Sequence, residues 1–136
     1  MALMRIGYQV LLDPDLVYAI RATGFFENTG FPLELAVFCD VPHLNPGEVF
    51  ATIKQFDDVR SLMGIVPNSK GRLRPVARDL FVDTGKVCGI FVSEDKTKAS
   101  MSFRFAPDRG VTLEIGANTA MEAVSKFPWP HDASRT

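Results

Sequence analysis

The chain has 136 residues, of which 46% are hydrophobic, and a formal net charge of −1 at pH 7. This length suits one domain with a single core, and no segment approaches the roughly 20 apolar residues that span a bilayer. The near-neutral charge gives the whole chain no electrostatic attraction to nucleic acid or anionic lipid. We therefore expect a cytoplasmic protein with a single α+β domain over residues 1–127 and a loose tail over residues 128–136.

Strict alternation of apolar and polar residues predicts several half-buried strands. Successive side chains of a strand point to opposite faces, so a strand with one buried face has an apolar residue at every second position. This pattern, or a short apolar run, occurs over residues 4–10, 33–39, 80–82, 99–105 and 111–115.

A short helix is predicted between the first two of these strands. Asp13 followed by Pro14 marks a helix start, and Gly24 can end a helix, so the predicted helix covers residues 14–23. The alternative is a second strand, because residues 17–20 (VYAI) favour a sheet.

The clearest helical pattern begins after Asn45 and Pro46 and ends at Gly64. Its apolar side chains recur with a period of 3.6 residues, at Val49, Phe50, Ile53, Phe56, Val59 and Met63. Arg60 falls near the middle of this stripe, where a charge is costly unless it is paired or reaches water. Asp57 is its nearest candidate partner; otherwise Arg60 can hold an anionic ligand or a partner's carboxylate.

Residues 86–116 predict a three-strand antiparallel meander. Its first run, residues 87–92, is apolar on both faces, which predicts a central strand covered on both sides. Pairing apolar with apolar residues at the last turn places Phe105 opposite Val111, with a five-residue loop over 106–110.

Thr119 and Glu122 have capping-box spacing for a last helix near residues 120–127. No internal repeat is apparent. The predicted fold is α+β, with a mixed, mainly antiparallel sheet that ends in the meander (about 86–116), and with two or three helices packed on the sheet.

Residues that could carry catalysis are few. Cys39, Asp40 and His43 lie within five residues and could form a nucleophile with its base or a metal site. However, Cys39 should face the core with the other inward residues of its strand, and His43 follows Pro42 in a turn. Cys39 and Cys88 are expected to be buried free thiols in a reducing compartment, with a disulfide between neighbouring strands as the alternative. The sequence therefore favours a protein that is not an enzyme, with no catalytic residue, metal or cofactor.

Exposed aromatic residues are the first candidate binding site. Phe25, Phe26 and Phe31 lie in a loop rich in glycine and proline, and Trp129 lies between two prolines after the last helix. Exposed apolar groups mark partner interfaces or ligand clefts, so we expect these residues and Arg60 to bind a ligand or a partner. The alternative is that the loop folds back and covers the core.

A basic segment is the second candidate. Lys70, Arg72, Arg74 and Arg78 could contact phosphate groups, although runs of charge usually form solvated surfaces. Nucleic acid is therefore not the favoured partner.

Together, these features favour a non-enzymatic protein-interaction module, with a homodimer as one form of it. One alternative is a binding protein for a small hydrophobic ligand in a Phe-lined pocket. Another is a weak nucleic-acid binder that uses residues 70–78.

Overall fold

The computed structural model describes residues 3–6, 10–25, 32–65 and 72–129. In chain order its elements are β1 (Met4–Ile6), β2 (Val10–Leu12), the 3-10 turn η1 (Pro14–Leu16), β3 (Val17–Phe25), β4 (Pro32–Cys39), β5 (Ala51–Ile53), α1 (Phe56–Ile65), β6 (Leu73–Ala77), β7 (Leu80–Asp83), the 3-10 turn η2 (Thr84–Lys86), β8 (Val87–Val92), β9 (Ala99–Ala106), β10 (Arg109–Ile115) and α2 (Ala117–Lys126).

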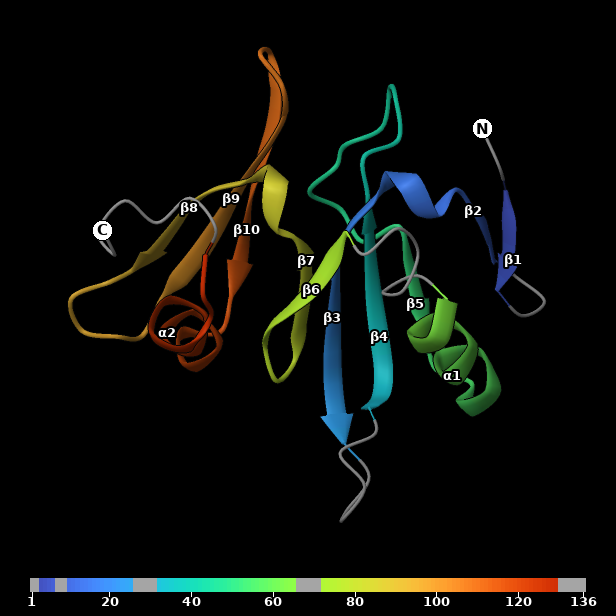
Figure 1. Ribbon diagram of the computed structural model, residues 1–136, viewed down its shortest axis with the longest axis horizontal. Coiled ribbons are helices and arrows are strands. Elements are labelled where there is room, and N and C mark those ends of the chain that lie inside the picture. Colours follow the sequence, from blue (N-terminus) through green and yellow to red (C-terminus); the bar gives the residue numbers. More distant parts are fainter. Residues whose placement is uncertain (1–2, 7–9, 26–31, 66–71, 130–136) are drawn as a thin grey trace.

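The strands form three antiparallel sheets (Figure 1). The largest has the order β5-β4-β3-β7-β6, the second is the meander β10-β9-β8, and β1 pairs only with β2 among the described strands. The α+β prediction, with a mainly antiparallel sheet and a C-terminal meander, is confirmed. Neither helix of the described ranges has the length and apolar character needed to cross a membrane.

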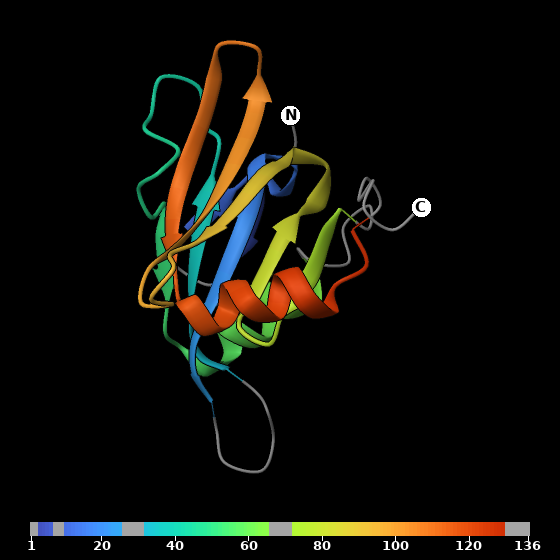
Figure 2. The same cartoon turned by 90° about the vertical axis from the view of Figure 1, so that its left-hand side faces the viewer.

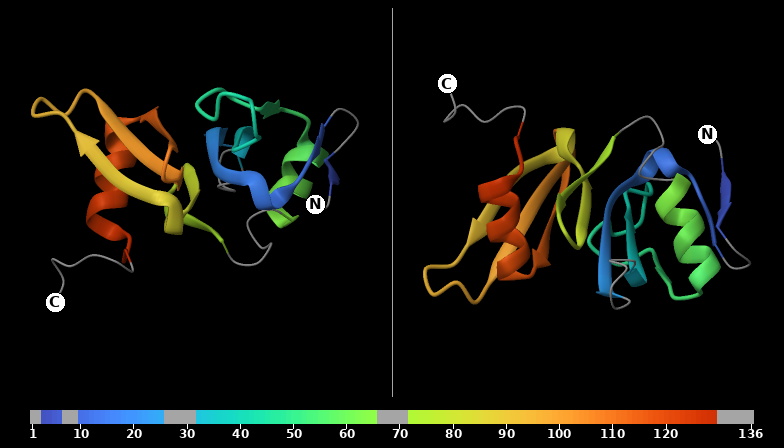
Figure 3. Two further views of the ribbon diagram at one scale, coloured as in Figure 1. Left: turned by 90° about the horizontal axis from the view of Figure 1, so that it is seen from above. Right: turned by 60° about the horizontal axis from the view of Figure 1, so that its bottom comes forward.

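Helix α1 packs on the largest sheet, whereas α2 packs on the meander and also contacts β6 of the largest sheet. Figure 2 shows α2 lying across the β8–β10 meander, where Ala120 and Ala123 are fully buried. In α1 the corresponding buried residues are Val59 and Leu62, which belong to the core that α1 forms with β4. Figure 3 shows the two helix-and-sheet units side by side, with the β6–β7 hairpin between them.

The two units have the same order of elements. The first runs β1, β2, η1, β3, β4, β5 and α1, and the second runs β6, β7, η2, β8, β9, β10 and α2. Each 3-10 turn begins at a buried aspartate: Asp13 Oδ1 accepts a hydrogen bond from the Asp15 amide at 3.0 Å, and Asp83 Oδ1 accepts one from the Gly85 amide at 3.2 Å. The chain is therefore a structural repeat, which the sequence did not reveal.

A β-bulge occurs at the same place in both units. The pairing of β3 with β4 shifts between Val17 and Ala19, and the pairing of β8 with β9 shifts between Val87 and Gly89. Aligning Asp13 with Asp83 also aligns these two bulges. This alignment defines equivalent positions in the two units, which are 70 residues apart from η1 through β8.

The second hairpin crosses into the first unit. Strand β7 pairs with β3, placing Ala19 opposite Val82, Ile20 opposite Phe81 and Arg21 opposite Leu80. The pairing makes β3 a central strand and joins the units through one continuous sheet.

Two helix predictions are wrong. Residues 14–16 make one 3-10 turn and residues 17–25 continue as β3, because the sheet-favouring run after Leu16 outweighs the helix-start signal at Pro14. The predicted helix from Asn45 to Gly64 is present only from Phe56 onward. Residues 51–53 form β5, which pairs with β4.

Two details of the meander are also wrong. Strand β8 is an edge strand of its sheet and not a central one. The last hairpin pairs Phe103, not Phe105, with Val111, so the two strands continue toward the turn as far as Ala106 and Arg109. A Cβ atom on Gly110 would lie 2.6 Å from the Phe103 carbonyl oxygen, so this close approach of the two strands requires glycine.

The last helix lacks the predicted capping box. Its N-cap is Gly116, and the helix starts at Ala117. Thr119 donates its hydroxyl hydrogen bond to the Asp79 carboxylate at 2.8 Å, while Glu122 accepts from the Arg78 amide at 2.6 Å. Both side chains thus tie α2 to the β6–β7 turn.

Candidate nucleic-acid interface

The Cys39, Asp40 and His43 group does not form a catalytic arrangement. Cys39 is buried at the end of β4, whereas His43 is exposed, with a positive φ of 71°. The Asp40 carboxylate accepts a hydrogen bond from Arg109 Nε and is held in that ion pair. Among the described residues, no group of three His, Cys, Asp or Glu side chains is placed to hold a metal ion.

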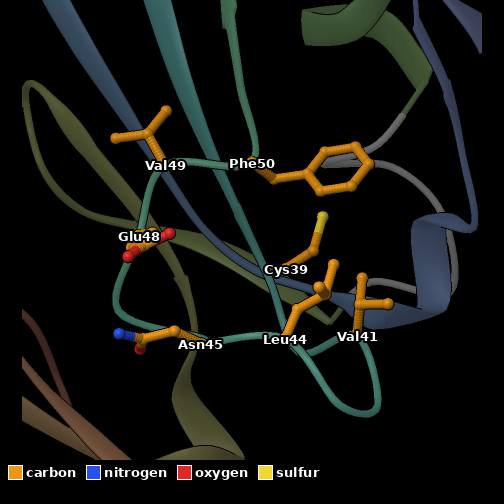
Figure 4. A pocket seen from close by; sticks show the side chains of 7 residues that line it. All are labelled: Cys39, Val41, Leu44, Asn45, Glu48, Val49 and Phe50. Atoms are coloured by element: carbon orange, nitrogen blue, oxygen red, sulfur yellow. The ribbon is translucent and has the colours of Figure 1, made fainter.

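A hollow of about 270 Å³ lies beside this group (Figure 4). Figure 4 shows the Cys39 thiol beside the Phe50 ring, with the Asn45 and Glu48 side chains farther out on the loop. The loop is fixed from outside the hollow: Arg109 Nη2 donates to the Leu44 carbonyl at 2.8 Å, and the Tyr18 hydroxyl donates to the Pro46 carbonyl. Two hydrogen bonds from outside the hollow therefore hold its loop, and the Cys39 thiol is part of its lining.

The chemistry of that thiol follows from its burial. The pKa of the Cys39 thiol is raised from 9.0 to about 12. Burial is the larger cause, and the nearby charge of Asp13 is the smaller one. The thiolate is the reactive form, so at neutral pH Cys39 is inert. The prediction that both thiols are buried is wrong for Cys88, which is an exposed free thiol on β8.

We expect the two thiols to differ in reactivity and in their effect on stability. A thiol reagent at pH 8 should modify Cys88 in the folded protein and Cys39 only after unfolding. Because folding raises the pKa of Cys39, its contribution to stability is complete below the unfolded-state pKa and is lost as pH rises from about 9 toward 12. Urea titrations at several pH values should show this loss.

The control is Cys39→Ala, which should lose less stability than the wild type between pH 9 and 12. Burial also raises the pKa of Tyr18, and the nearby Cys39 adds to that shift, so the variant removes part of the Tyr18 contribution as well and the expected difference keeps its sign. Equal pH slopes for wild type and variant, or modification of Cys39 at the rate of Cys88, would contradict the prediction.

The predicted aromatic site is only partly within the described residues. Phe26 and Phe31 lie outside them. Phe25 is partly buried, and the Arg78 guanidinium carbon lies 4.5 Å from its ring centroid. Trp129 packs against the core beneath α2, and its Nε1 donates to the Ala123 carbonyl at 2.9 Å. Arg60 is exposed on α1.

The predicted basic segment separates into structural and exposed parts. Lys70 lies outside the described residues. Arg72 connects the two repeat units, since its Nη1 pairs with Asp83 at 3.4 Å and its Nη2 donates to the Pro14 carbonyl at 3.0 Å. Arg74 and Arg78 are exposed, so these two guanidinium groups are accessible from solvent.

A basic groove forms where β6 meets the end of α2. It has a volume of about 410 Å³ and is lined by Pro75, Val76, Ala77, Arg78, Glu122, Lys126, Phe127 and Pro128. Arg74 precedes these residues on β6, with its Cα opposite Val82 of β7. The name basic groove denotes this surface together with Arg74. The carboxylate that lines it, Glu122, is engaged by the Arg78 amide.

Arg74, Arg78 and Lys126 are exposed and form no salt bridge with any residue in the described ranges. Sequence reasoning found the two arginines and missed Lys126, which lies 48 residues beyond Arg78 and reaches the groove only because α2 packs on β6. The small residues Ala120 and Ala123, at helical spacing, were the signal that this helix lies close to its sheet.

No family model matches the chain, and no curated protein does. Among solved structures, a similar chain is a LytTr DNA-binding domain of a putative methyl-accepting/DNA response regulator from Bacillus cereus, at 11% identity and a TM-score of 0.43. The match covers 92% of this chain and 98% of the other. A similarity this low does not establish a shared fold or a shared function.

The prediction of a non-enzymatic protein-interaction module, with its alternative of a Phe-lined ligand pocket, is corrected by the structure of its own aromatic residues. Trp129 packs on its own core, and the Arg78 guanidinium lies over the Phe25 ring. Both aromatic side chains therefore have contacts within the chain.

Proposed function

We propose that the protein binds nucleic acid through the basic groove. The observation that carries the proposal is that Arg78 and Lys126, both exposed, line one groove, and that the exposed Arg74 precedes this groove on β6. The carboxylate of the lining, Glu122, accepts a hydrogen bond from the Arg78 amide. Phosphate groups are the partners that such a set of exposed cations favours. The overall charge of −1 does not oppose this, because binding depends on the local field at the groove.

The side chains of the basic groove suit contacts with the phosphate backbone of a nucleic acid better than contacts with its bases. Arginine and lysine contact phosphates irrespective of sequence, and the remaining lining is mainly apolar. Three cations that each neutralise one phosphate give a slope of about −2.7 when the logarithm of the duplex association constant is plotted against the logarithm of salt concentration. We therefore expect salt-dependent binding with little sequence preference.

The test is fluorescence anisotropy with a labelled DNA duplex at several salt concentrations. Arg74→Ala combined with Lys126→Ala should weaken binding and reduce the salt slope by about 2. Arg78 is left unchanged because it also contacts Phe25.

The matched control is Lys54→Ala combined with Arg60→Ala, which removes the same charge from exposed positions of the first unit. This variant should keep the wild-type affinity and slope. If both double variants lose the same affinity, binding follows net charge and the groove has no special role. If neither changes it, or if the wild type does not bind, the proposal fails.

A further inference from the structure

Strands β3 and β8 hold the same position in the two units but differ in what lies beside them. Strand β3 pairs with β4 on one side and with β7 on the other, whereas β8 pairs only with β9 among the described strands. The exposure of the residues follows this difference. Tyr18 and Ala19 are buried, while their equivalents Cys88 and Gly89 are exposed, and Phe91 has 62% of its surface exposed.

The β6–β7 hairpin shows what the first unit gains from the additional strand beside β3. Beyond pairing with β3, the β6–β7 hairpin places Leu73 in the core of the first unit, where it is 4% exposed. Phe81 of the same hairpin packs against that core. In this repeat, then, a hairpin at the start of one unit supplies a strand and two apolar side chains to the neighbouring unit.

The β1–β2 hairpin has the same strand pairing as the β6–β7 hairpin, but no strand in the described part of the chain pairs with its outer edge. Strand β1 pairs with β2 so that Arg5 lies opposite Leu11, as Pro75 lies opposite Phe81 in the second hairpin. The equivalent of Phe81 is Leu11, which is 46% exposed, and the equivalent of Leu73 is Leu3, which is 64% exposed. Leu3 and Leu11 thus face solvent, whereas their equivalents Leu73 and Phe81 pack in or against the core of the neighbouring unit.

We infer that the β1–β2 hairpin of one copy of the chain adds to the free edge of β8 in a second copy. Transferring the β3–β7 register to this contact places Leu12 opposite Gly89, Leu11 opposite Ile90 and Val10 opposite Phe91. The contact continues the arrangement that already joins the two units within a chain. Strand addition of this kind satisfies the backbone groups of an edge strand and buries alternate side chains.

The sequence of β8 fits this role. Residues 87–92 include no charged residue and no proline, the residues that usually keep an exposed edge strand from pairing with another chain. The β1–β2 hairpin and β8 lie at opposite ends of the molecule (Figure 1), so the hairpin cannot pair with β8 of its own copy. The contact is head-to-tail and uses a different surface on each copy, unlike an interface through Trp129 and Phe25.

Sedimentation velocity over a range of protein concentrations tests the contact. Wild type should associate as concentration rises, and Leu11→Glu should abolish this association because it places a charge in the new sheet. The variant should fold normally, since Leu11 is 46% exposed in a single copy. The control is Leu44→Glu, at a position 54% exposed on another surface, which should associate as the wild type does.

A disulfide between copies tests the register. In a Cys88→Ser background, Leu11→Cys and Ile90→Cys proteins should form a crosslinked pair when mixed under oxidising conditions. Facing residues of antiparallel strands lie within the Cα distance that a disulfide requires. Replacing Ile90→Cys by Glu114→Cys, on the opposite edge of the meander, should give no crosslink with Leu11→Cys. A wild type that stays monomeric at all concentrations, association that survives Leu11→Glu, or equal crosslinking of both pairs would overturn the inference.

Discussion

Tyr18→Ala is expected to destabilise the protein by about 3–5 kcal/mol, the range for removing a large aromatic side chain from a core. Tyr18 is 1% exposed on β3 and lies where the two units meet. Its ring centroid is 4.8 Å from those of both Phe103 and Phe105 on β9. Its hydroxyl also donates to the Pro46 carbonyl, which belongs to the first unit. One side chain therefore contributes to the interface between units and to the loop beside it.

Chemical denaturation followed by circular dichroism measures this loss, and Tyr18→Phe separates its two parts. The phenylalanine variant keeps the ring contacts and leaves the buried Pro46 carbonyl unpaired, for an expected loss of about 1–3 kcal/mol. A loss from Tyr18→Phe as large as that from Tyr18→Ala would mean that the ring contributes nothing to the interface. A loss below about 1 kcal/mol from Tyr18→Ala would show that the units are held together without it.

Local patterns predicted the strands that lie within one unit. The alternation of residues 99–105 identifies the buried face of β9, on which Met101 and Phe103 are 0% and 2% exposed. The alternation of residues 33–39 likewise identifies β4. These patterns were sufficient because each strand pairs with a neighbour close in sequence and has one face toward its own helix.

Features that depend on the repeat were not predictable in the same way. The units share a buried aspartate followed by valine and isoleucine, at Asp13, Val17 and Ile20 and again 70 residues later, but too few identical residues to be visible as a repeat. The crossing of the β6–β7 hairpin to β3 is a contact between distant residues, and no local period encodes it. The prediction for residues 87–92 is wrong because apolar residues on both faces indicate only how the faces of a strand are covered, and do not specify its place in the sheet.

Only part of the basic groove could be predicted from the sequence, because the groove also depends on how the two units pack. Arg74 and Arg78 are close in sequence and were predicted as parts of one charged segment. Arg72 lies in the same segment, but its guanidinium binds the Pro14 carbonyl of η1 and the Asp83 carboxylate. Charge alone does not separate these roles. What separates them is whether buried carbonyl and carboxylate groups lie within reach, which only the packing of the two units determines.

Leu62→Ala and Ala123→Leu, at equivalent positions of α1 and α2, are both expected to destabilise the protein. Leu62 and Ala123 are each 0% exposed, at the seventh residue of their helices. Leu62→Ala leaves a cavity in the first core and should cost about 2–5 kcal/mol. Ala123→Leu forces a larger side chain between α2 and its sheet and should cost about 1–3 kcal/mol.

The pair tests whether the two units have diverged in how closely their helices pack. The small residues of α2 allow the helix to lie close to the sheet, and this approach brings Lys126 to β6 and Glu122 to the Arg78 amide. Ala123→Leu should therefore also weaken nucleic-acid binding, whereas Leu62→Ala should leave the affinity of the folded protein unchanged. The control Val124→Leu adds volume at a position of α2 that is 52% exposed and should change neither stability nor affinity. A stable Ala123→Leu protein with full affinity would show that close packing of α2 does not hold the groove together, and the position of Lys126 would then need another cause.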